Sequence, residues 1–218
     1  MISPGRPRLL GQAPDTSGSG TAGIHIFWDQ SNLFVPLRFI ASRREGRLEE
    51  RGIRLHFPNL YRLARAGRTV AKAVCVGSIP PDLGRLWDRI SDLGVTVEVQ
   101  ERGAQSNTEQ GVDAALQLHM LHSLTDSPPS VAVLLTGDGA GYDQGRGFLA
   151  DLERMAKGGW AVEVLSWRAA CAQHLRRFAE EQGIFVALDD YYEAITFLAD
   201  GRRVAPLSLK HRALARAS

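Results

Sequence analysis

The sequence predicts an α/β fold in which helices cover both faces of a central, mainly parallel sheet. Short apolar runs alternate with helix-like segments from about residue 24 to residue 198, and this alternation is typical of parallel strands joined by helical crossovers. The run Val131–Leu135 is almost wholly apolar, as expected of a central strand that is covered on both faces. No internal repeat interrupts the pattern.

Length and composition indicate one globular domain. The chain has 218 residues, of which 44% are hydrophobic and 23% are charged, and one core commonly serves chains of up to about 250 residues. We expect a flexible segment over residues 1–23, a domain over residues 24–200 and a basic tail over residues 201–218. Because no apolar run approaches the roughly 18 residues of a membrane span and no signal peptide is evident, we expect a cytoplasmic protein without a membrane partner.

The elements of the first half follow from apolar periodicity and breaker residues. After a strand ending at Asp29, we expect a helix over 33–42, in which Pro36 is acceptable only within the first turn. An exposed insertion over 43–56 comes next. The pattern then predicts a helix over 58–66, a strand over 69–76, a helix from Asp82 to Leu93, a strand over 95–99 and a helix over 112–124.

The second half continues the alternation. The strand over 131–135 leads into a glycine-rich loop over 139–147 and a helix ending at Lys157, where Gly158 and Gly159 stop it. A strand over 161–166, a helix over 168–182, a short strand over 184–187 and a last helical turn over 191–198 complete the chain. Cys75 and Cys171 are too few for a disulfide framework or a four-ligand zinc site.

The stretch Ile24–Leu33 carries the clearest functional candidate. Its apolar residues end in Asp29, and Ser31 or Asn32 can cap the helix that follows. An acid at the carboxyl end of a parallel strand lies where open α/β sheets bind ligands. The alternative is that Asp29 only caps a turn, since Asp is common at such junctions.

Two further acids occur in comparable places. Asp113 opens the helix after the polar loop, and Asp138 follows the central strand. Strand ends and nearby helix starts share one crevice in such a sheet, so Asp29, Asp113 and Asp138 can converge. Clustered carboxylates repel unless a proton or cation neutralises them. Because the ligands are hard oxygens, we expect Mg²⁺ or Mn²⁺, which would activate a water against a phosphodiester.

Other motifs have weaker functional interpretations. The loop Gly137–Asp143 does not match the dinucleotide pattern Gly-x-Gly-x-x-Gly, and its acid would repel a pyrophosphate. His119 and His122 share a helical face but lack a third metal ligand. Six arginines lie between residues 38 and 54, and Arg43, Arg44 and Arg47 are the candidates to contact a nucleic-acid backbone. The alternative is a solvated helix face with internal ion pairs, and the basic tail allows the same two interpretations.

Four motifs in order resemble NYN-domain proteins of the PIN-like nuclease superfamily. They are Phe27–Leu33, Gly77–Pro81, Gly111–Leu116 and Leu135–Gly139. The resemblance spans residues 24–198 and implies a Rossmann-like PIN fold with metal-dependent RNA cleavage. It matches Asp29, Asp113 and Asp138 to the family's acids and Asn32 to its polar companion.

The sequence departs from that family at one of its acids, and a second, smaller mismatch is Glu109–Gln110, where a basic residue is common. A second acid often follows two residues after the one matched by Asp138, but Ala140 stands there. Asp143 is the candidate to replace it as a metal ligand, and the alternative is a helix cap. Ser78 and Thr136 end strands at the crevice, where they can bind phosphate, orient a metal-bound water or make turn hydrogen bonds.

We therefore expect a Mg²⁺- or Mn²⁺-dependent endoribonuclease that acts on RNA, with single-stranded RNA as the favoured substrate. Asp29, Asp113 and Asp138 would hold the metal, and Asn32 would position the metal or the phosphate. The runner-up is a module that binds RNA or a protein without cutting, which Ala140 favours. A phosphatase or nucleotide hydrolase acting on small molecules is a third hypothesis, and a homodimer is compatible with the sequence.

Overall fold

The computed structural model describes residues 23–78, 84–100, 108–140, 142 and 145–217. Its strands are β1 (Ile24–Asp29), β2 (Ile53–Leu55), β3 (Val70–Ser78), β4 (Thr96–Gln100), β5 (Val131–Leu135), β6 (Ala161–Ser166), β7 (Ile184–Ala187) and β8 (Thr196–Leu198). Its α-helices are α1 (Gln30–Arg44), α2 (Phe57–Arg65), α3 (Gly84–Ser91), α4 (Thr108–Asp126), α5 (Gly147–Lys157), α6 (Gln173–Gln182) and α7 (Tyr192–Ile195). Short 3₁₀ turns are η1 (Glu49–Arg51) and η4 (Leu188–Tyr191).

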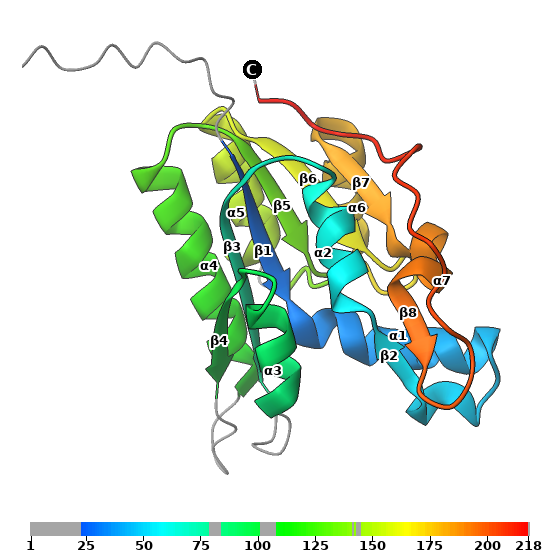
Figure 1. Ribbon diagram of the computed structural model, residues 1–218. Helices are drawn as coiled ribbons and strands as arrows, with labels where there is room; N and C mark the ends of the chain where they lie inside the picture. The colour runs from blue at the N-terminus through cyan, green and yellow to red at the C-terminus, as the bar shows by residue number, and fades with distance from the viewer. Residues whose placement is uncertain (1–22, 79–83, 101–107, 141, 143–144, 218) are drawn as a thin grey trace, which may run out of the picture.

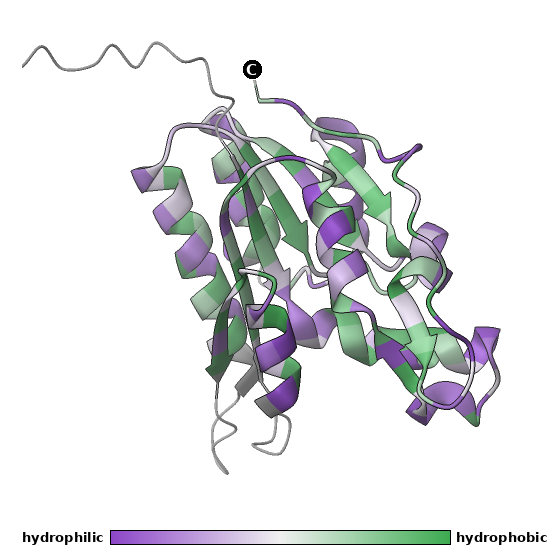
Figure 2. Ribbon diagram, in the orientation of Figure 1, coloured by the Kyte–Doolittle hydropathy of each residue, from purple (hydrophilic) through white to green (hydrophobic). Residues whose placement is uncertain are grey.

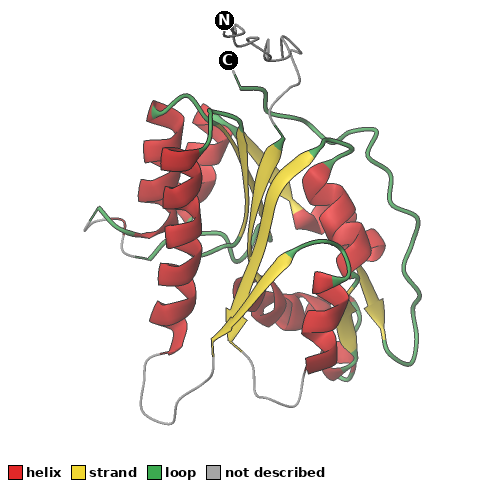
Figure 3. Cartoon of the chain, turned by 60° about the vertical axis from the view of Figure 1, so that its left-hand side comes forward, coloured by secondary structure: helices red, strands yellow, loops and turns green. Residues whose placement is uncertain are grey.

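The central sheet has six parallel strands in the order β4-β3-β1-β5-β6-β7. Strand order reverses between β1 and β5, because β3 and β4 extend the sheet on one side of β1 and β5, β6 and β7 extend it on the other. The carboxyl ends of these strands lie along the lower edge of the sheet in Figure 1, where α1 begins. Helices lie on both faces (Figure 3), so the predicted fold class is confirmed.

Two apolar clusters fill the space between the sheet and its helices. One contains Trp28 of β1 and buried residues of α1, α2, α3 and α7. The other contains Phe27 of β1 and buried residues of α4, α5 and α6. Figure 2 shows the strands between them as a largely hydrophobic layer. Among the described helices, none combines the length and the apolar character needed to cross a bilayer.

The start of helix α1 differs from the prediction in two respects, namely its N-cap residue and the position of Pro36. Asp29, rather than Ser31 or Asn32, is the N-cap, because its side chain accepts a hydrogen bond from the backbone N–H of Asn32. The helix therefore starts at Gln30, and Pro36 lies in its second turn instead of the first. A proline there provides no N–H for the carbonyl of Asn32.

Three other predicted elements are corrected by contacts that are distant in sequence. The expected insertion over 43–56 contains β2, whose buried Ile53 and Leu55 face the core. The expected last helix over 191–198 ends early, because residues 196–198 form β8 and pair antiparallel with β2. Helix α6 begins at Gln173 rather than at 168. Asp82 lies outside the described residues, so its predicted cap is untested.

Candidate active site

Asp29 ends β1 at the point where the strand order reverses. Ligands bind to open α/β sheets at the carboxyl ends of strands flanking such a point. The side chain is fully buried, and its Oδ1 accepts the backbone N–H of Asn32 at 3.1 Å. The capping alternative is thus correct as a description of one oxygen. It does not account for the second oxygen, which faces other groups.

Asn32 and Thr136 surround that second oxygen. The Nδ2 of Asn32 donates a short hydrogen bond to Asp29 Oδ2, and the hydroxyl of Thr136 donates to the same atom at 3.2 Å. Thr136 directly follows β5 and is fully buried. These contacts join the ends of β1 and β5, and they bring together three of the residues that the sequence singled out.

Asp138 lies beside this group. Its backbone N–H donates to the Thr136 hydroxyl at 3.2 Å, and its Oδ1 accepts the N–H of Ala140 at 3.0 Å. The side chain is half-buried. Thr136 therefore links the two acids, since it donates to Asp29 and accepts from Asp138.

The electrostatic environment of Asp29 is unfavourable to its charge. Burial is the main cause that raises the pKa of this carboxyl, and the negative charge of Asp138 raises it further. The hydrogen bonds from Asn32 and Thr136 act in the opposite direction but do not cancel the shift. Among the described residues, no Lys, Arg or His lowers this pKa through an ion pair. Within the described ranges, the two neighbouring acids thus have no basic side chain as a partner.

Asp113 lies in the second turn of α4, half-buried. Its neighbour Val112 packs in the same apolar cluster as Phe27 and Val76. Within the part of the chain that the structure describes, no group of three or more His, Cys, Asp or Glu side chains is placed to hold a metal ion. The convergence of Asp113 with Asp29 and Asp138 therefore stays a prediction.

Several other predicted residues lie away from the acids or outside the description. Asp143 lies outside the described residues, and so does the side chain of Ser78 at the end of β3. Arg43, Arg44 and Arg47 lie at or beyond the far end of α1, and a helix of this length spans about 22 Å.

The three arginines differ in their contacts. Arg44 lies over the ring of Tyr192, 4.6 Å from its centroid, and 3.9 Å from a carboxylate oxygen of Asp189. Arg43 and Arg47 are exposed, and neither forms an ion pair within the described ranges. Arg44 is exposed as well, but its guanidinium already contacts Tyr192 and Asp189, so Arg43 and Arg47 are the less committed of the three side chains.

Sequence reasoning missed Gln30. It follows Asp29, is only 3% exposed, and its Oε1 has no hydrogen-bond partner among the described residues. A glutamine at the first position of a helix carries no sequence signal of burial. Its orphaned oxygen is a buried acceptor that none of the described groups satisfies, one residue after Asp29.

The donor set fits a divalent cation that prefers oxygen. It comprises the carboxylates of Asp29 and Asp138 and the amide oxygen of Asn32. Mg²⁺ is commonly held by one or two carboxylates and keeps several waters, which later give way to substrate phosphates. A complete cage of protein ligands is therefore not required for such an ion.

Comparison with known proteins gives one family and one fold neighbour. The family model described as NYN domain matches residues 23–187, a range that includes every strand of the central sheet. Comparison with curated proteins returns no match. A crystal structure of a protein of unknown function from Vibrio parahaemolyticus aligns with a TM-score of 0.54 and 18% identity, and the alignment covers 79% of this chain and 97% of that chain. At this identity the likeness shows the fold alone.

Proposed function

The chain belongs to the NYN-domain family of the PIN-like nuclease superfamily, and from this premise we propose that it is a metal-dependent endoribonuclease that cuts RNA at the carboxyl ends of β1 and β5. The ion would be Mg²⁺ or Mn²⁺, in keeping with the general dependence of NYN nucleases on divalent metals. Asp29 and Asp138 would hold it, Asn32 would supply an amide oxygen, and Thr136 would orient Asp29.

One observation carries the proposal. Asp29 is a fully buried carboxyl whose pKa is raised mainly by burial and further by Asp138. Two like charges about 4 Å apart repel by roughly 4 kcal/mol at an effective dielectric constant near 20. A divalent cation would remove that cost. A bound metal of this kind lowers the pKa of a coordinated water and neutralises charge on a phosphodiester under attack.

The sheet geometry supports Asp113 as the third acid. Side chains alternate between the two faces of a strand, so Asp29 lies on the same face as Phe27. Phe27 packs in the cluster that contains Val112, the residue before Asp113. Helix α4 thus covers the face of the sheet toward which Asp29 is directed. We propose that Asp113 reaches the metal or one of its waters from this helix.

The residues around the acids have separate roles in this proposal. Ser78 would bind a phosphate oxygen or orient a metal-bound water, whereas Thr136 already donates its hydroxyl proton to Asp29 and keeps the positioning role. Arg43 and Arg47 would hold the RNA backbone at the far end of α1, because acids at the reaction centre repel phosphates there. Asp143 would add a ligand from the glycine-rich loop.

A module that binds RNA or a protein without cutting is the second candidate. Ala140 favours it, since its position in the family often carries an acid. At this position the chain offers the metal no side-chain oxygen, and the backbone N–H of Ala140 instead occupies one oxygen of Asp138. Such a module would keep the fold and the capping role of Asp29.

The deciding experiment is cleavage of a labelled single-stranded RNA with Mn²⁺, Mg²⁺ or a chelator. We expect metal-dependent cutting by the wild-type protein and its loss in Asp29→Asn and Asp138→Asn. Asp92→Asn is the matched control, because Asp92 is exposed at the end of α3, away from the acids. RNA binding without cutting by the wild type, across both metals, would instead establish the binding module.

A further inference from the structure

A groove of about 510 Å³ lies between α5 and α6. Both helices follow strands of the central sheet, β5 and β6, so both begin at the edge that carries Asp29 and Asp138. Residues of the two helices and Tyr142 line the groove. The proposed reaction centre uses none of these side chains.

Two aromatic rings line the groove next to the loop that carries Asp138. Tyr142 and His174 are stacked, with ring centroids 5.3 Å apart and an angle of 21° between the planes. The hydroxyl of Tyr142 donates to Glu153 Oε1 at 2.9 Å, which ties the ring to α5. His174 belongs to the first turn of α6. The pair therefore forms a flat surface supported by both helices, and Tyr142 is 36% exposed.

The stacked pair is attached to the loop that carries Asp138. The Nε2 of His174 lies 2.9 Å from the carbonyl oxygen of Gly139, which requires that this nitrogen carry the proton. The backbone N–H of Ala172 donates to the carbonyl of Gly137 at 2.9 Å. A side chain at Gly139 would clash with Ala172 and His174. The acid and the aromatic surface are thus held in a fixed relation.

The distance along this loop is short. Four residue steps separate Asp138 from Tyr142, and four steps span at most about 14 Å. Single-stranded nucleic acids occupy binding sites several nucleotides long. One strand can therefore place a phosphodiester at the acids and a neighbouring base at Tyr142.

The lining of the groove suits a planar, uncharged ring with polar edges. Leu149, Ala156 and Phe178 provide apolar surface, and Glu153 provides a hydrogen-bond acceptor. Lys157 and Arg177 are balanced by Glu153 and Glu181, so the groove has no excess of positive charge that would favour a bare phosphate. Aromatic side chains stack on unpaired bases regardless of their identity.

We propose that this groove is a nucleobase-binding subsite for single-stranded RNA, with Tyr142 stacked on a base that lies next to the scissile phosphate. The inference rests on the proposed function and adds to it the contact that selects an unpaired strand. A duplex would be excluded, because its bases are stacked on one another and their faces are not available to Tyr142.

RNA affinity in the presence of chelator tests the subsite without cleavage. Fluorescence anisotropy would compare the wild type, Tyr142→Ala, Tyr142→Phe and His174→Ala on one labelled single-stranded RNA. Loss of one base stack weakens binding by about 5- to 140-fold, and we expect this for Tyr142→Ala. Tyr142→Phe keeps the ring and should bind nearly as well as the wild type. Circular dichroism would verify that each variant is folded.

A set of RNAs with one abasic position each identifies the stacked base. For the wild type, we expect one position at which base removal weakens binding as much as Tyr142→Ala does. The variant and that abasic RNA together should show no further loss, because both remove the same stack. Equal affinity of the wild type and Tyr142→Ala for intact RNA would overturn the subsite.

The outcomes separate the subsite from the nuclease. If the wild type cuts RNA with Mn²⁺ but Tyr142→Ala binds RNA as tightly as the wild type, the subsite proposal is wrong and the nuclease proposal is supported. If RNA binding depends on Tyr142 but no metal supports cutting, the subsite proposal is supported and the nuclease proposal is wrong. The protein would then be a module that binds RNA without cutting it. If the wild type does not bind RNA, both are wrong. If the groove takes a protein segment and not a base, Tyr142→Ala will leave RNA affinity unchanged, and the subsite proposal is overturned.

Discussion

Two carboxylates in this protein are equally buried but lie in opposite electrostatic environments. Asp29 and Glu163 each have 0% exposure, and each belongs to a strand of the central sheet. Burial is the largest influence on both and raises both pKa values. The net result differs, since the pKa of Asp29 remains raised, whereas hydrogen bonds and charges from Arg68 and Arg212 bring that of Glu163 below its ordinary value.

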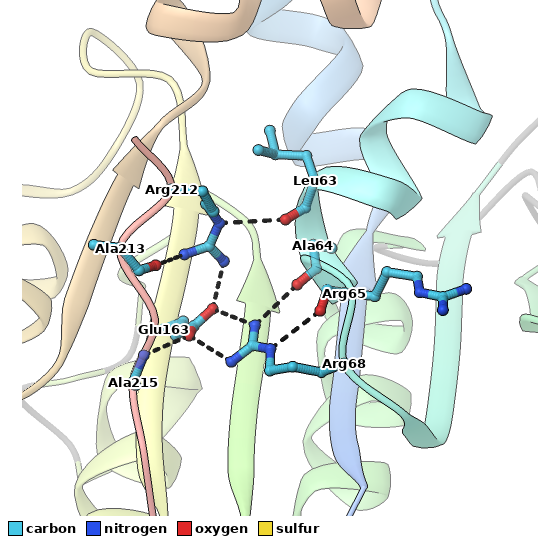
Figure 4. Close-up of polar contacts among 8 residues, drawn as sticks. All are labelled: Leu63, Ala64, Arg65, Arg68, Glu163, Arg212, Ala213 and Ala215. Atoms are coloured by element: carbon cyan, nitrogen blue, oxygen red, sulfur yellow. Dashed lines mark hydrogen bonds and ion pairs between the residues drawn. The ribbon is translucent and has the colours of Figure 1, made fainter. Parts of the chain in front are cut away.

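The contacts of Glu163 explain the difference (Figure 4). Arg68 donates to its two oxygens at 2.7 and 2.9 Å. Arg212 donates to Oε2, and the backbone N–H of Ala215 donates to Oε1 at 2.8 Å. Among the described residues, Asp29 accepts hydrogen bonds only from uncharged groups of Asn32 and Thr136. The protein neutralises Glu163 with two arginines, and a proton or a cation would do the same for Asp29.

The comparison also assigns a role to the C-terminal tail. Arg212 is 7% exposed and donates to the carbonyl of Leu63 as well as to Glu163. Leu207, Leu209 and Ala215 pack against the core. Arg212 is therefore a structural residue, and of the two interpretations of the basic tail its contacts favour the one with internal ion pairs. The tail attaches to the sheet beyond the last residue matched by the family model.

Glu163→Gln should cause the largest loss of stability. The substitution leaves two arginines near a neutral amide, and breaking a buried ion pair from one side costs about 3–5 kcal/mol. Urea denaturation would measure the free energy of unfolding, with the exposed Glu181→Gln as the matched control. Because the folded pKa of Glu163 is lowered, its contribution is complete above its unfolded pKa and is lost as the pH falls through the folded pKa. A loss below about 1 kcal/mol at neutral pH would refute the assigned role.

Asp29→Asn should change stability far less, and in the opposite direction. The side-chain amide of Asn32 can turn over and the hydroxyl of Thr136 can rotate, so the hydrogen bonds can be remade with an amide at position 29. In chelator at neutral pH, we expect a change within about 1 kcal/mol, with the variant at least as stable as the wild type. A substantial destabilisation would mean that Asp29 is primarily a structural cap.

The pH dependence of that difference has a definite sign. Because the folded pKa of Asp29 is raised, the wild type loses stability as the pH rises from the unfolded pKa through the folded pKa. Asp29→Asn lacks this loss. The stability of the variant relative to the wild type should therefore increase as the pH rises from the unfolded to the folded pKa of Asp29, and then stay constant. Thermal unfolding at a series of pH values would detect this change.

The exposed arginines at the end of α1 provide the smallest expected effect. Arg43 and Arg47 have no ion pair within the described residues, unlike the buried Arg212. If both contact phosphates, Arg43→Ala/Arg47→Ala should reduce the slope of log affinity for single-stranded RNA against log salt by about 1.4. Arg65→Ala/Arg89→Ala removes two exposed arginines from α2 and α3 and serves as the control. An unchanged slope in Arg43→Ala/Arg47→Ala would show that these arginines do not contact phosphates. It would support the alternative that they lie on a solvated helix face.

The sequence predicts the sheet well because apolar runs determine which segments are buried. Asp29 and Asp138 were identifiable for the same reason, since each follows such a run. Glu163 was not singled out, although an acid inside the apolar strand 161–166 is a signal that a cation must lie nearby. Its partners come from residues 68 and 212, and no local pattern connects these positions.

Contacts between distant segments also explain the wrong elements. Residues 196–198 form a strand only because β2 lies beside them, whereas locally they continue a helical turn. The stacking of Tyr142 on His174 likewise joins the loop after β5 to the first turn of α6, which is distant in sequence. The predicted ligand Asp143 lies outside the described residues, so its role remains a proposal.

Measuring proton release on Mn²⁺ binding tests most directly the claim that Asp29 binds a divalent cation in place of a proton. Calorimetric titration at about pH 5.5 and about pH 7.5, in buffers of different ionisation enthalpy, measures the affinity and the protons released. We predict that Mn²⁺ binds the wild type, displaces a proton and binds more tightly at the higher pH. Asp29→Asn should lose both the tight binding and the proton release, while Asp92→Asn keeps them. Equal affinity and equal proton release in Asp29→Asn and the wild type would contradict the account.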